Sequence, residues 1–332
     1  MRLIFSVLLL LCLAAPLLAD PVLGRARLEV RDEARNKTLL VDVWYPVAPG
    51  TAGTEQDGPF ITSPEARDVA IQGDQLPLVM LSHGFHGQPA NLSWIAQALV
   101  ARGYVVAGPT HDDPNRQHLH MNHWERARDI SAALTGLLDS PLGQHLDEQR
   151  VGMVGYSLGG GTGIWLAGGL ATTYRRTANP GADYAPQEEF FPVGSVQYNQ
   201  LMASTDFEQA ARSYRDPRLK AFFLLAPSLG WAFDAESLEQ VGVPMEIVLG
   251  TRDEMLVPRS NGEYFAGHVP DCQLRVVEGA GHYVFLDLVR SEALRADPAL
   301  AEIAVDPPGV DRLVVHQEVA GWMIEFFDQN LR

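Results

Sequence analysis

The chain has 332 residues, 46% hydrophobic and 20% charged, a composition typical of a globular protein with a sizeable core, which excludes disordered and fibrous classes. Its 25 basic and 41 acidic side chains give a formal net charge of -16. Because phosphate binding needs clustered Lys and Arg, this charge argues against a nucleic-acid partner, and it also disfavours docking to an anionic membrane surface.

The first nineteen residues are typical of a secretory signal peptide. Arg2 supplies a positive charge, residues 3–13 are apolar, and Ala19 precedes a plausible cleavage point. The alternative is a membrane anchor, but a membrane-spanning helix requires about 20 apolar residues, more than this segment has. We therefore predict a signal peptide at residues 1–19, a mature domain at residues 20–332, a periplasmic or secreted location and no stable membrane anchor after cleavage.

Short apolar runs alternate with segments of helical spacing through most of the chain. Residues 25–30 and 38–45 predict an antiparallel hairpin, and residues 46–75, rich in Gly, Pro and acidic side chains, predict a long surface loop. The alternation that follows predicts an α/β fold with a mostly parallel sheet and helices on both faces. Strands are predicted at residues 76–82, 104–109, 151–156, 221–225, 245–249 and 273–277, and helices at residues 91–102, 124–138 and 316–330.

The alternation breaks off at residues 171–219, where aromatic residues, Pro and Asn occur without a clear period. Two interpretations stay open: an inserted lid or cap above the sheet, or a long surface excursion. In the first, the aromatic side chains would line an acyl or aryl pocket, and in the second they would anchor the loop to the body. These side chains are Tyr174, Tyr184, Phe190, Phe191 and Tyr198.

The strongest motif is Gly155-Tyr156-Ser157-Leu158-Gly159, which lies between a predicted strand and a glycine-rich helix start. A serine at such a sharp turn has strained backbone geometry, and its hydroxyl projects above the sheet. The helix N-terminus that follows favours negative charge near that hydroxyl. The motif therefore predicts Ser157 as a nucleophile, and the alternative is a turn that only packs a helix on a strand.

A loop of histidine and glycine at residues 83–87 follows the first predicted parallel strand. Nucleophilic attack on a carbonyl creates an oxyanion that needs two N–H donors, each worth a factor of ~10² to 10³ in rate. We predict that the backbone amides of Phe85 and Leu158 are these donors. The alternative is that residues 83–87 are a plain connection between a strand and a helix.

A second glycine-rich loop carries His282 after the last predicted strand, and we predict this side chain as the base. An acid should orient the imidazole, and Asp253 follows the predicted strand at residues 245–249. The neighbouring Glu254 is the alternative acid, and capping of a helix is the alternative role of Asp253. The resulting chain order, Ser then acid then His, fits the setting of the serine motif.

These motifs together resemble those of the α/β-hydrolase superfamily, and within it the bacterial dienelactone-hydrolase-like and platelet-activating-factor-acetylhydrolase-like esterases. The resemblance covers roughly residues 25–330 and includes a Val-Trp-Tyr-Pro run at residues 43–46. Dienelactone hydrolases use a cysteine where this chain has Ser157, and the acetylhydrolase-like enzymes place their acid soon after the nucleophile, unlike Asp253. The resemblance therefore implies hydrolysis of a small-molecule carboxylic ester through an acyl-enzyme intermediate, without a cofactor, but no particular substrate.

Several alternatives stay open at this stage. A peptidase or amidase would use the same three side chains, and a binding protein of the same fold would use none of them. Tyr156 and Tyr283, beside the predicted nucleophile and base, are candidate substrate contacts, as are Phe190 and Phe191 in the inserted segment. Nothing in the sequence indicates a protein partner.

A cluster of histidine and acidic side chains lies between residues 109 and 126. Such a cluster could bind a metal ion, but it follows the end of a predicted strand, where loops that line a site naturally lie. We interpret it as a polar loop at the rim of the pocket and predict no metal. Its members are His111, Asp112, Asp113, His118, His120 and His123.

Overall fold

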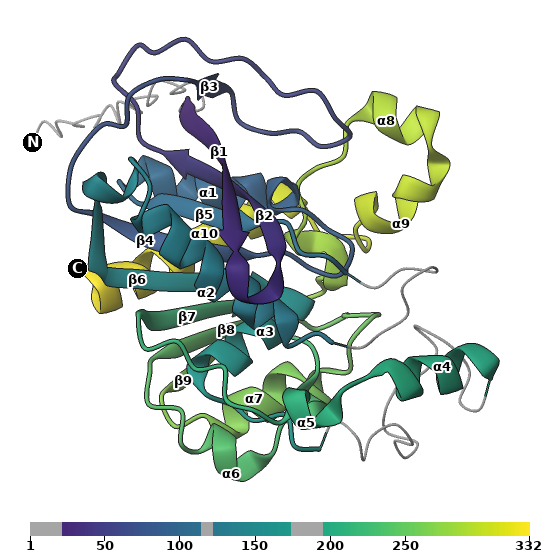
Figure 1. The fold of residues 1–332 in the computed structure, drawn as a ribbon. Coiled ribbons are helices and arrows are strands. Elements are labelled where there is room, and N and C mark those ends of the chain that lie inside the picture. The colour runs from purple at the N-terminus through teal and green to yellow at the C-terminus, as the bar shows by residue number, and fades with distance from the viewer. Residues whose placement is uncertain (1–21, 114–121, 174–194) are drawn as a thin grey trace, which may run out of the picture.

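A computed structural model of the protein describes residues 22–113, 122–173 and 195–332 (Figure 1). The predicted signal peptide lies outside these residues, so that prediction stays untested. Tyr174, Tyr184, Phe190 and Phe191 also lie outside them.

In the described part of the chain, nine strands form one sheet with the order β3-β1-β2-β5-β4-β6-β7-β8-β9. The strands β1 and β2 form the predicted antiparallel hairpin, β2 is antiparallel to β5, and every pair from β5 to β9 is parallel. The predicted α/β fold with a mostly parallel sheet is therefore confirmed. The strands are β1 (Leu23–Asp32), β2 (Lys37–Tyr45), β3 (Glu65–Arg67), β4 (Leu76–Ser82), β5 (Val105–Pro109), β6 (Leu146–Tyr156), β7 (Leu219–Leu225), β8 (Met245–Gly250) and β9 (Cys272–Val277).

Helices cover both faces of the sheet (Figure 1). One core lies between the sheet and the helices α1 and α10, and the other between the sheet and α2, α3 and α7. The described helices are α1 (Ser93–Ala101), α2 (Glu125–Leu138), α3 (Leu158–Ala167), α4 (Val196–Ser204), α5 (Phe207–Ala210), α6 (Ala235–Leu238), α7 (Gly262–His268), α8 (Ser291–Ala296), α9 (Ala301–Ala304) and α10 (Arg312–Leu331).

The strand β4 shows why its sequence is apolar without interruption. Leu78 and Met80 enter the core on the side of α2 and α3, whereas Val79 and Leu81 enter the core on the side of α1 and α10. A parallel strand at the centre of the sheet is buried on both faces, so that alternation with polar residues is lost. The observed bounds of β4 equal the predicted ones.

The prediction of a loop throughout residues 46–75 is wrong at β3, which pairs with β1 in parallel. The sequence gives no periodic signal there, because the strand has three residues and begins with the charged Glu65. The Glu65 carboxylate is nevertheless buried, since it accepts hydrogen bonds from Arg25 Nη1 at 2.7 Å and from Trp44 Nε1 at 2.8 Å. The segment between β9 and α10 likewise holds α8 and α9, two short helices that the sequence did not predict.

The described end of the inserted segment contains α4 and α5, and Figure 1 shows α4 standing away from the sheet. Residues 174–194 lie outside the described part, so the lid or cap remains a prediction. Within the described residues, none of the helices combines the length and the apolar character needed to cross a bilayer.

Candidate active site

Ser157 connects β6 to α3 in a sharp turn whose backbone has φ +53° and ψ -115°. A positive φ is uncommon for a residue with a side chain and costs about 1 to 3 kcal/mol of strain. The turn closes only because its neighbours lack side chains: a Cβ on Gly155 would overlap the Gly159 carbonyl, and a Cβ on Gly159 would overlap the Ser82 carbonyl. The serine motif therefore has the predicted strand–turn–helix structure, at the carboxyl end of β6.

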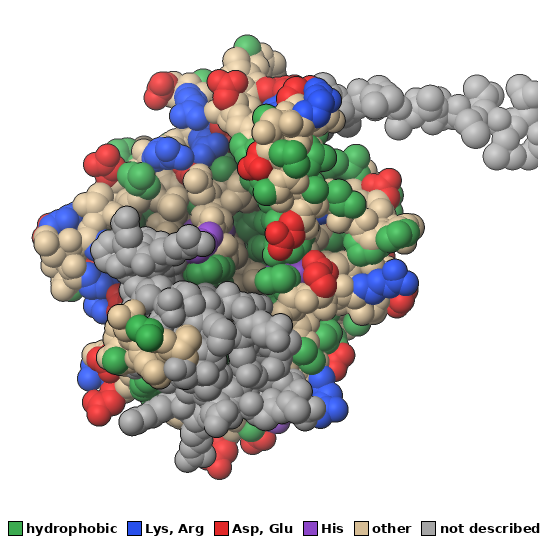
Figure 2. All heavy atoms as spheres, turned by 90° about the vertical axis from the view of Figure 1, so that its right-hand side faces the viewer, with side chains coloured by type: hydrophobic (Ala, Val, Ile, Leu, Met, Phe, Trp, Pro, Cys, Tyr) green, Lys and Arg blue, Asp and Glu red, His purple; other side chains and the backbone are tan. Residues whose placement is uncertain are grey.

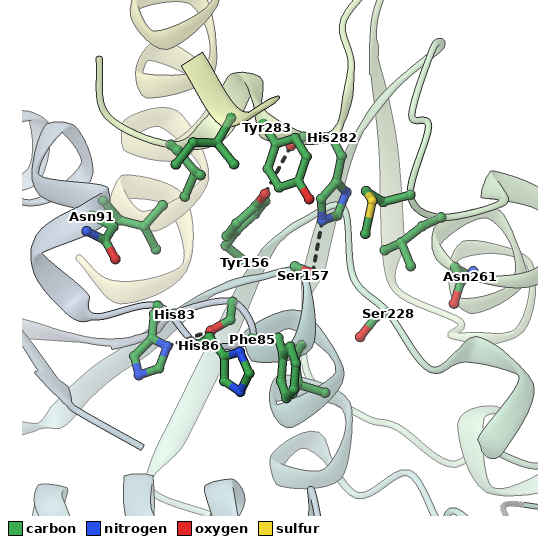
Figure 3. Close-up of a pocket in the computed structure, with 18 of the residues that line it drawn as sticks. His83, Phe85, His86, Asn91, Tyr156, Ser157, Ser228, Asn261, His282 and Tyr283 are labelled. Carbon is green, nitrogen blue, oxygen red and sulfur yellow. Dashed lines mark hydrogen bonds between the residues drawn. The ribbon is translucent and has the colours of Figure 1, made fainter. Parts of the chain in front are cut away.

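Three side chains that are far apart in the sequence form a chain of hydrogen bonds at this edge of the sheet. His282 Nε2 lies 3.0 Å from Ser157 Oγ (Figure 3), and His282 Nδ1 lies 2.8 Å from Asp253 Oδ2. A carboxylate only accepts hydrogen bonds, so Nδ1 carries the proton of the neutral imidazole and Nε2 accepts from the serine hydroxyl. His282 is 4% exposed, which keeps these hydrogen bonds away from competing water.

The two neighbouring carboxylates after β8 have different partners. Asp253 Oδ1 accepts the backbone N–H groups of Met255 at 2.9 Å and Leu256 at 2.7 Å, which leaves Oδ2 facing the imidazole. Glu254 Oε2 instead accepts the backbone N–H of His282 at 3.0 Å. The structure thus brings Asp253 against the imidazole ring, and Glu254 against the backbone of the loop that carries it.

Phe85 and Leu158, the predicted oxyanion donors, both line the cavity that contains Ser157. The loop at residues 83–87 passes close to the serine, because a Cβ built on Gly84 would lie 3.5 Å from Ser157 Cβ. Leu158 opens α3, so its amide belongs to the helix N-terminus. Both residues therefore lie at the cavity that contains the hydroxyl, and the role of their amides in binding an oxyanion remains a prediction.

A cavity of about 540 Å³ surrounds the serine hydroxyl, and Figure 2 shows a hollow on this face of the molecule. None of the described residues that line it has an Asp, Glu, Lys or Arg side chain. Ten of its described lining residues have apolar side chains that the sequence did not predict, because they come from segments spread along the whole chain. These are Phe60, Leu92, Leu229, Trp231, Met255, Leu256, Val257, Leu286, Leu300 and Ile303.

The two predicted tyrosine contacts lie in this cavity (Figure 3). The Tyr156 hydroxyl donates to the backbone carbonyl of His282 at 3.2 Å, and burial raises the pKa of Tyr156 well above its usual 10. Tyr156 thus stays protonated and fixes the loop that carries the imidazole. The Tyr283 ring meets the His282 ring edge to face at 5.4 Å. The other two predicted contacts, Phe190 and Phe191, lie outside the described residues.

Of the described histidines in the cluster after β5, His123 lies at the cavity as predicted, whereas His111 does not. His123 lines the cavity, but His111 is buried, where its Nε2 lies 3.0 Å from Ser82 Oγ and its Nδ1 lies 3.0 Å from Asp129 Oδ2. In the described part of the chain, no group of three or more His, Cys, Asp or Glu side chains could hold a metal ion. His118 and His120 lie outside that part.

Several buried groups near the site have shifted pKa values. Burial lowers the pKa of His83 and of His111 well below 6.5, with a further contribution from the nearby Arg126 charge, and burial lowers the pKa of His316 to about 4. Burial also raises the pKa of the Asp287 carboxyl to about 6, against the effect of hydrogen bonds from Ser93. The three imidazoles are therefore neutral in the folded protein at pH 5.

We expect the free energy of unfolding to fall as the pH drops from 7 toward 4. The unfolded chain protonates its histidines below about pH 6.5, whereas the folded chain keeps His83, His111 and His316 neutral, so unfolding takes up protons. Asp287 opposes this between about pH 4 and pH 6, because its folded carboxyl is the more protonated. For these four groups alone, the net uptake near pH 5 is about two protons, or roughly 3 kcal/mol per pH unit, and urea unfolding at pH 7, 6 and 5 measures it.

The variant His316→Gln provides the control for this prediction. Glutamine keeps a donor for the Val284 carbonyl, which His316 Nε2 contacts at 2.8 Å, but it does not titrate. The proton uptake on unfolding should therefore fall by about one proton. The free energy of unfolding should then change less steeply with pH, by about 1.4 kcal/mol per pH unit. A slope that is the same in both proteins, or no slope at all in the parent protein, would contradict the prediction.

The fold and the site together define a class. A mostly parallel sheet with a serine in a strained turn after one strand, and with an acidic side chain and a histidine after two later strands, is the architecture of the α/β hydrolases. Residues 78–296 match the sequence profile described as the alpha/beta hydrolase family, and the chain belongs to that family. The superfamily predicted from the motifs is thereby confirmed.

Curated relatives match only a part of the chain. A segment of 96 residues, 27% of this chain, is 29% identical to Cutinase 2 of Thermobifida cellulosilytica, of which it covers 33%. The same length of sequence is 29% identical to the cutinase of Thermobifida fusca, of which it covers 27%. The chain thus matches a third or less of the length of these relatives.

Solved structures match over most of the chain at low identity. A ferulic acid esterase from Streptomyces cinnamoneus has a TM-score of 0.58 and 18% identity, over 96% of this chain and 92% of that one. A puromycin-hydrolyzing peptidase from Mycobacterium tuberculosis has a TM-score of 0.53 and 14% identity, over 92% of this chain and 39% of that one. At these identities the matches show a shared fold.

Proposed function

We propose that the protein hydrolyses carboxylic esters with Ser157 as nucleophile, His282 as general base and acid, and Asp253 as the acid that orients the imidazole. The observation that carries this proposal is the continuous chain of hydrogen bonds from Ser157 Oγ through the imidazole to the Asp253 carboxylate. The esterases and cutinases among the similar proteins support the choice of an ester.

In the first half of the reaction, His282 Nε2 accepts the hydroxyl proton while Ser157 Oγ attacks the ester carbonyl carbon. The carbonyl oxygen becomes an oxyanion, to which the amides of Phe85 and Leu158 donate hydrogen bonds. Asp253 stabilises the imidazolium that forms and accepts a hydrogen bond from Nδ1, which keeps its proton. The imidazolium then gives its Nε2 proton to the departing alkoxide, which leaves as the alcohol.

In the second half, water takes the place of the alcohol. His282 accepts a proton from this water as the water oxygen attacks the acyl-serine carbonyl, and the same two amides bind the new oxyanion. Collapse of the intermediate breaks the bond to Ser157 Oγ, which recovers its proton from His282. The products are the carboxylic acid and the free enzyme, and no cofactor takes part.

The cavity supports an uncharged small-molecule ester as substrate. Its volume of about 540 Å³ falls within the range of about 300 to 1,000 Å³ that is usual for small-molecule sites. Its apolar walls would bury a hydrocarbon or aromatic group, and a charged group would lose hydration there without gaining a counter-ion from the described lining residues.

A fluorophosphonate probe tests the proposal directly, because it phosphonylates an activated serine. Incubation of the purified protein with this probe, followed by peptide mass spectrometry, should give one adduct on Ser157. Turnover of p-nitrophenyl esters with acyl chains of increasing length should be measured on the same preparation. A protein that neither reacts with the probe nor turns over any ester would favour the alternative of an inactive binding protein of this fold.

The same three side chains would also serve a peptidase or amidase, and none of the described lining residues favours one activity over the other. An anilide and a phenyl ester with the same acyl group provide the matched pair of substrates. We expect faster turnover of the ester. If the ratio of enzymatic to spontaneous hydrolysis rate is larger for the anilide than for the ester, the protein is an amidase and not an esterase.

Export to the periplasm or the medium is part of the proposal and depends on residues 1–19, which lie outside the described part. Expression of the full chain in a Gram-negative host, followed by N-terminal sequencing of the periplasmic fraction, tests it. We expect the mature chain to begin at Asp20.

A further inference from the structure

A buried arginine lies under the loop at residues 83–87. Arg126, in the first turn of α2, is 3% exposed, and its guanidinium donates to two successive backbone carbonyls of this loop. Nη1 donates to the His83 carbonyl at 2.8 Å, and Nη2 donates to the Gly84 carbonyl at 3.1 Å. The sequence predicted this region at the rim of the pocket and indicated no role for Arg126.

The Gly84 carbonyl belongs to the same peptide unit as the Phe85 N–H, the proposed oxyanion donor. A trans peptide is planar and holds its C=O and N–H on opposite sides. Anchoring the Gly84 oxygen at Arg126 therefore turns the Phe85 N–H away from the guanidinium, and rotation of the peptide would break that anchor. A cation bonded to the carbonyl also polarises the amide, which strengthens its N–H as a donor.

Two further donors bind the same oxygen. The Gly87 N–H donates to the Gly84 carbonyl at 3.1 Å, and His83 Nδ1 lies 2.6 Å from it. The backbone N–H of His111 donates to His83 Nε2 at 3.1 Å, so the proton of this neutral imidazole must be on Nδ1, where it points to the Gly84 oxygen. Three donors, one of them charged, thus fix a single peptide unit.

Asp113 is the counter-ion of Arg126 and also binds the loop at His86. Its side chain is 4% exposed, and Oδ1 lies 3.1 Å from Arg126 Nε. Asp113 Oδ2 accepts the backbone N–H of His86 at 2.7 Å, at a position where His86 has φ +55°. The carboxylate therefore balances the buried charge and stabilises a left-handed turn in the loop.

We propose that Arg126, with Asp113 as its counter-ion, is a positioning residue that fixes the orientation of the Gly84–Phe85 peptide as an oxyanion donor. The inference rests on the proposed ester hydrolysis, since it assigns a role in stabilising that reaction's oxyanion. Arg126 contacts no substrate in this scheme, because it acts from below the loop through the Gly84 carbonyl. Its loss should weaken binding of the tetrahedral state and spare binding of the planar ester.

The test compares the parent protein with Arg126→Gln, Arg126→Lys and Asp113→Asn, and measures kcat and KM with one p-nitrophenyl ester. Each protein is also titrated with an alkyl trifluoromethyl ketone, whose adduct with serine carries an oxyanion, and with the matching methyl ketone, which binds without forming one. Arg25→Gln is the control, because Arg25 is also buried and also paired, at 2.7 Å to Glu65 and 3.0 Å to Asp42.

For Arg126→Gln we expect kcat to fall by a factor of ~10² to 10³, the effect of losing one oxyanion donor, with KM nearly unchanged. Affinity for the trifluoromethyl ketone should fall in parallel with kcat, while affinity for the methyl ketone should equal that of the parent protein. Arg126→Lys should lose less, because lysine keeps the charge but cannot bind two carbonyls in the fork geometry of arginine. Asp113→Asn should show the same selective loss.

Two results would overturn the inference. One is an Arg126 or Asp113 variant that keeps the parent's affinity for the trifluoromethyl ketone, and the other is an equal loss of affinity for both ketones. If Arg126→Gln does not fold, Arg126→Lys and Asp113→Asn decide the question. Arg25→Gln should lower the unfolding temperature and leave the ratio of the two ketone affinities unchanged. An inactive, unlabelled parent protein would instead refute the proposed function, and the inference with it.

Discussion

Replacing Ser157 by alanine should lower kcat for p-nitrophenyl esters by a factor of ~10⁴ to 10⁶ and abolish labelling by a fluorophosphonate. The hydroxyl is the atom that would form the acyl-enzyme, and alanine leaves His282 with no alcohol to deprotonate. Any remaining turnover would come from water activated by the imidazole and from binding of the oxyanion. Stopped assays with wild-type and variant protein at equal concentration measure the ratio.

Stability and binding should not explain this loss. Alanine fits the turn as serine does, because both carry a Cβ at the strained φ of +53°. Ser228→Ala is the matched control: it also removes a hydroxyl from the cavity wall and should change kcat by no more than about tenfold. Equal losses in the two variants, or hydrolysis that survives in Ser157→Ala, would end the assignment of Ser157 as nucleophile.

Replacing Asp253 by asparagine should lower kcat by a factor of ~10⁴, the second-largest effect that we expect. The backbone N–H groups of Met255 and Leu256 bind Asp253 Oδ1, and they would bind the amide oxygen of asparagine in the same way. The amide nitrogen would then face His282 Nδ1 as a donor. This forces the imidazole proton onto Nε2, which faces the Ser157 hydroxyl. A protonated Nε2 can no longer accept the proton of that hydroxyl.

Glu254→Gln is the matched control for Asp253→Asn. It changes the neighbouring carboxylate to an amide, whose oxygen can still accept the His282 backbone N–H that Glu254 accepts at 3.0 Å. We expect a loss of no more than about tenfold, because the imidazole keeps its own partner. A large loss in Glu254→Gln together with near-normal activity in Asp253→Asn would assign the acid role to Glu254.

Local patterns predicted the elements that lie in the core. Burial on both faces makes β4 apolar throughout, and the helix predicted at residues 124–138 appears as Glu125–Leu138. The same patterns missed β3, whose first residue, Glu65, is charged and is buried only because Arg25 and Trp44 reach it from neighbouring strands. They also missed α8 and α9, which are too short to show a helical period.

Neighbouring residues alone predicted the family and the strand that carries Ser157, because turns and strand periodicity are local patterns. The side-chain contacts needed the folded chain: which carboxylate contacts the imidazole, which distant segments form the cavity, and that Arg126 lies buried beneath the loop at residues 83–87. Contacts across a hundred residues depend on strand register and helix placement, which the packing of the whole core fixes.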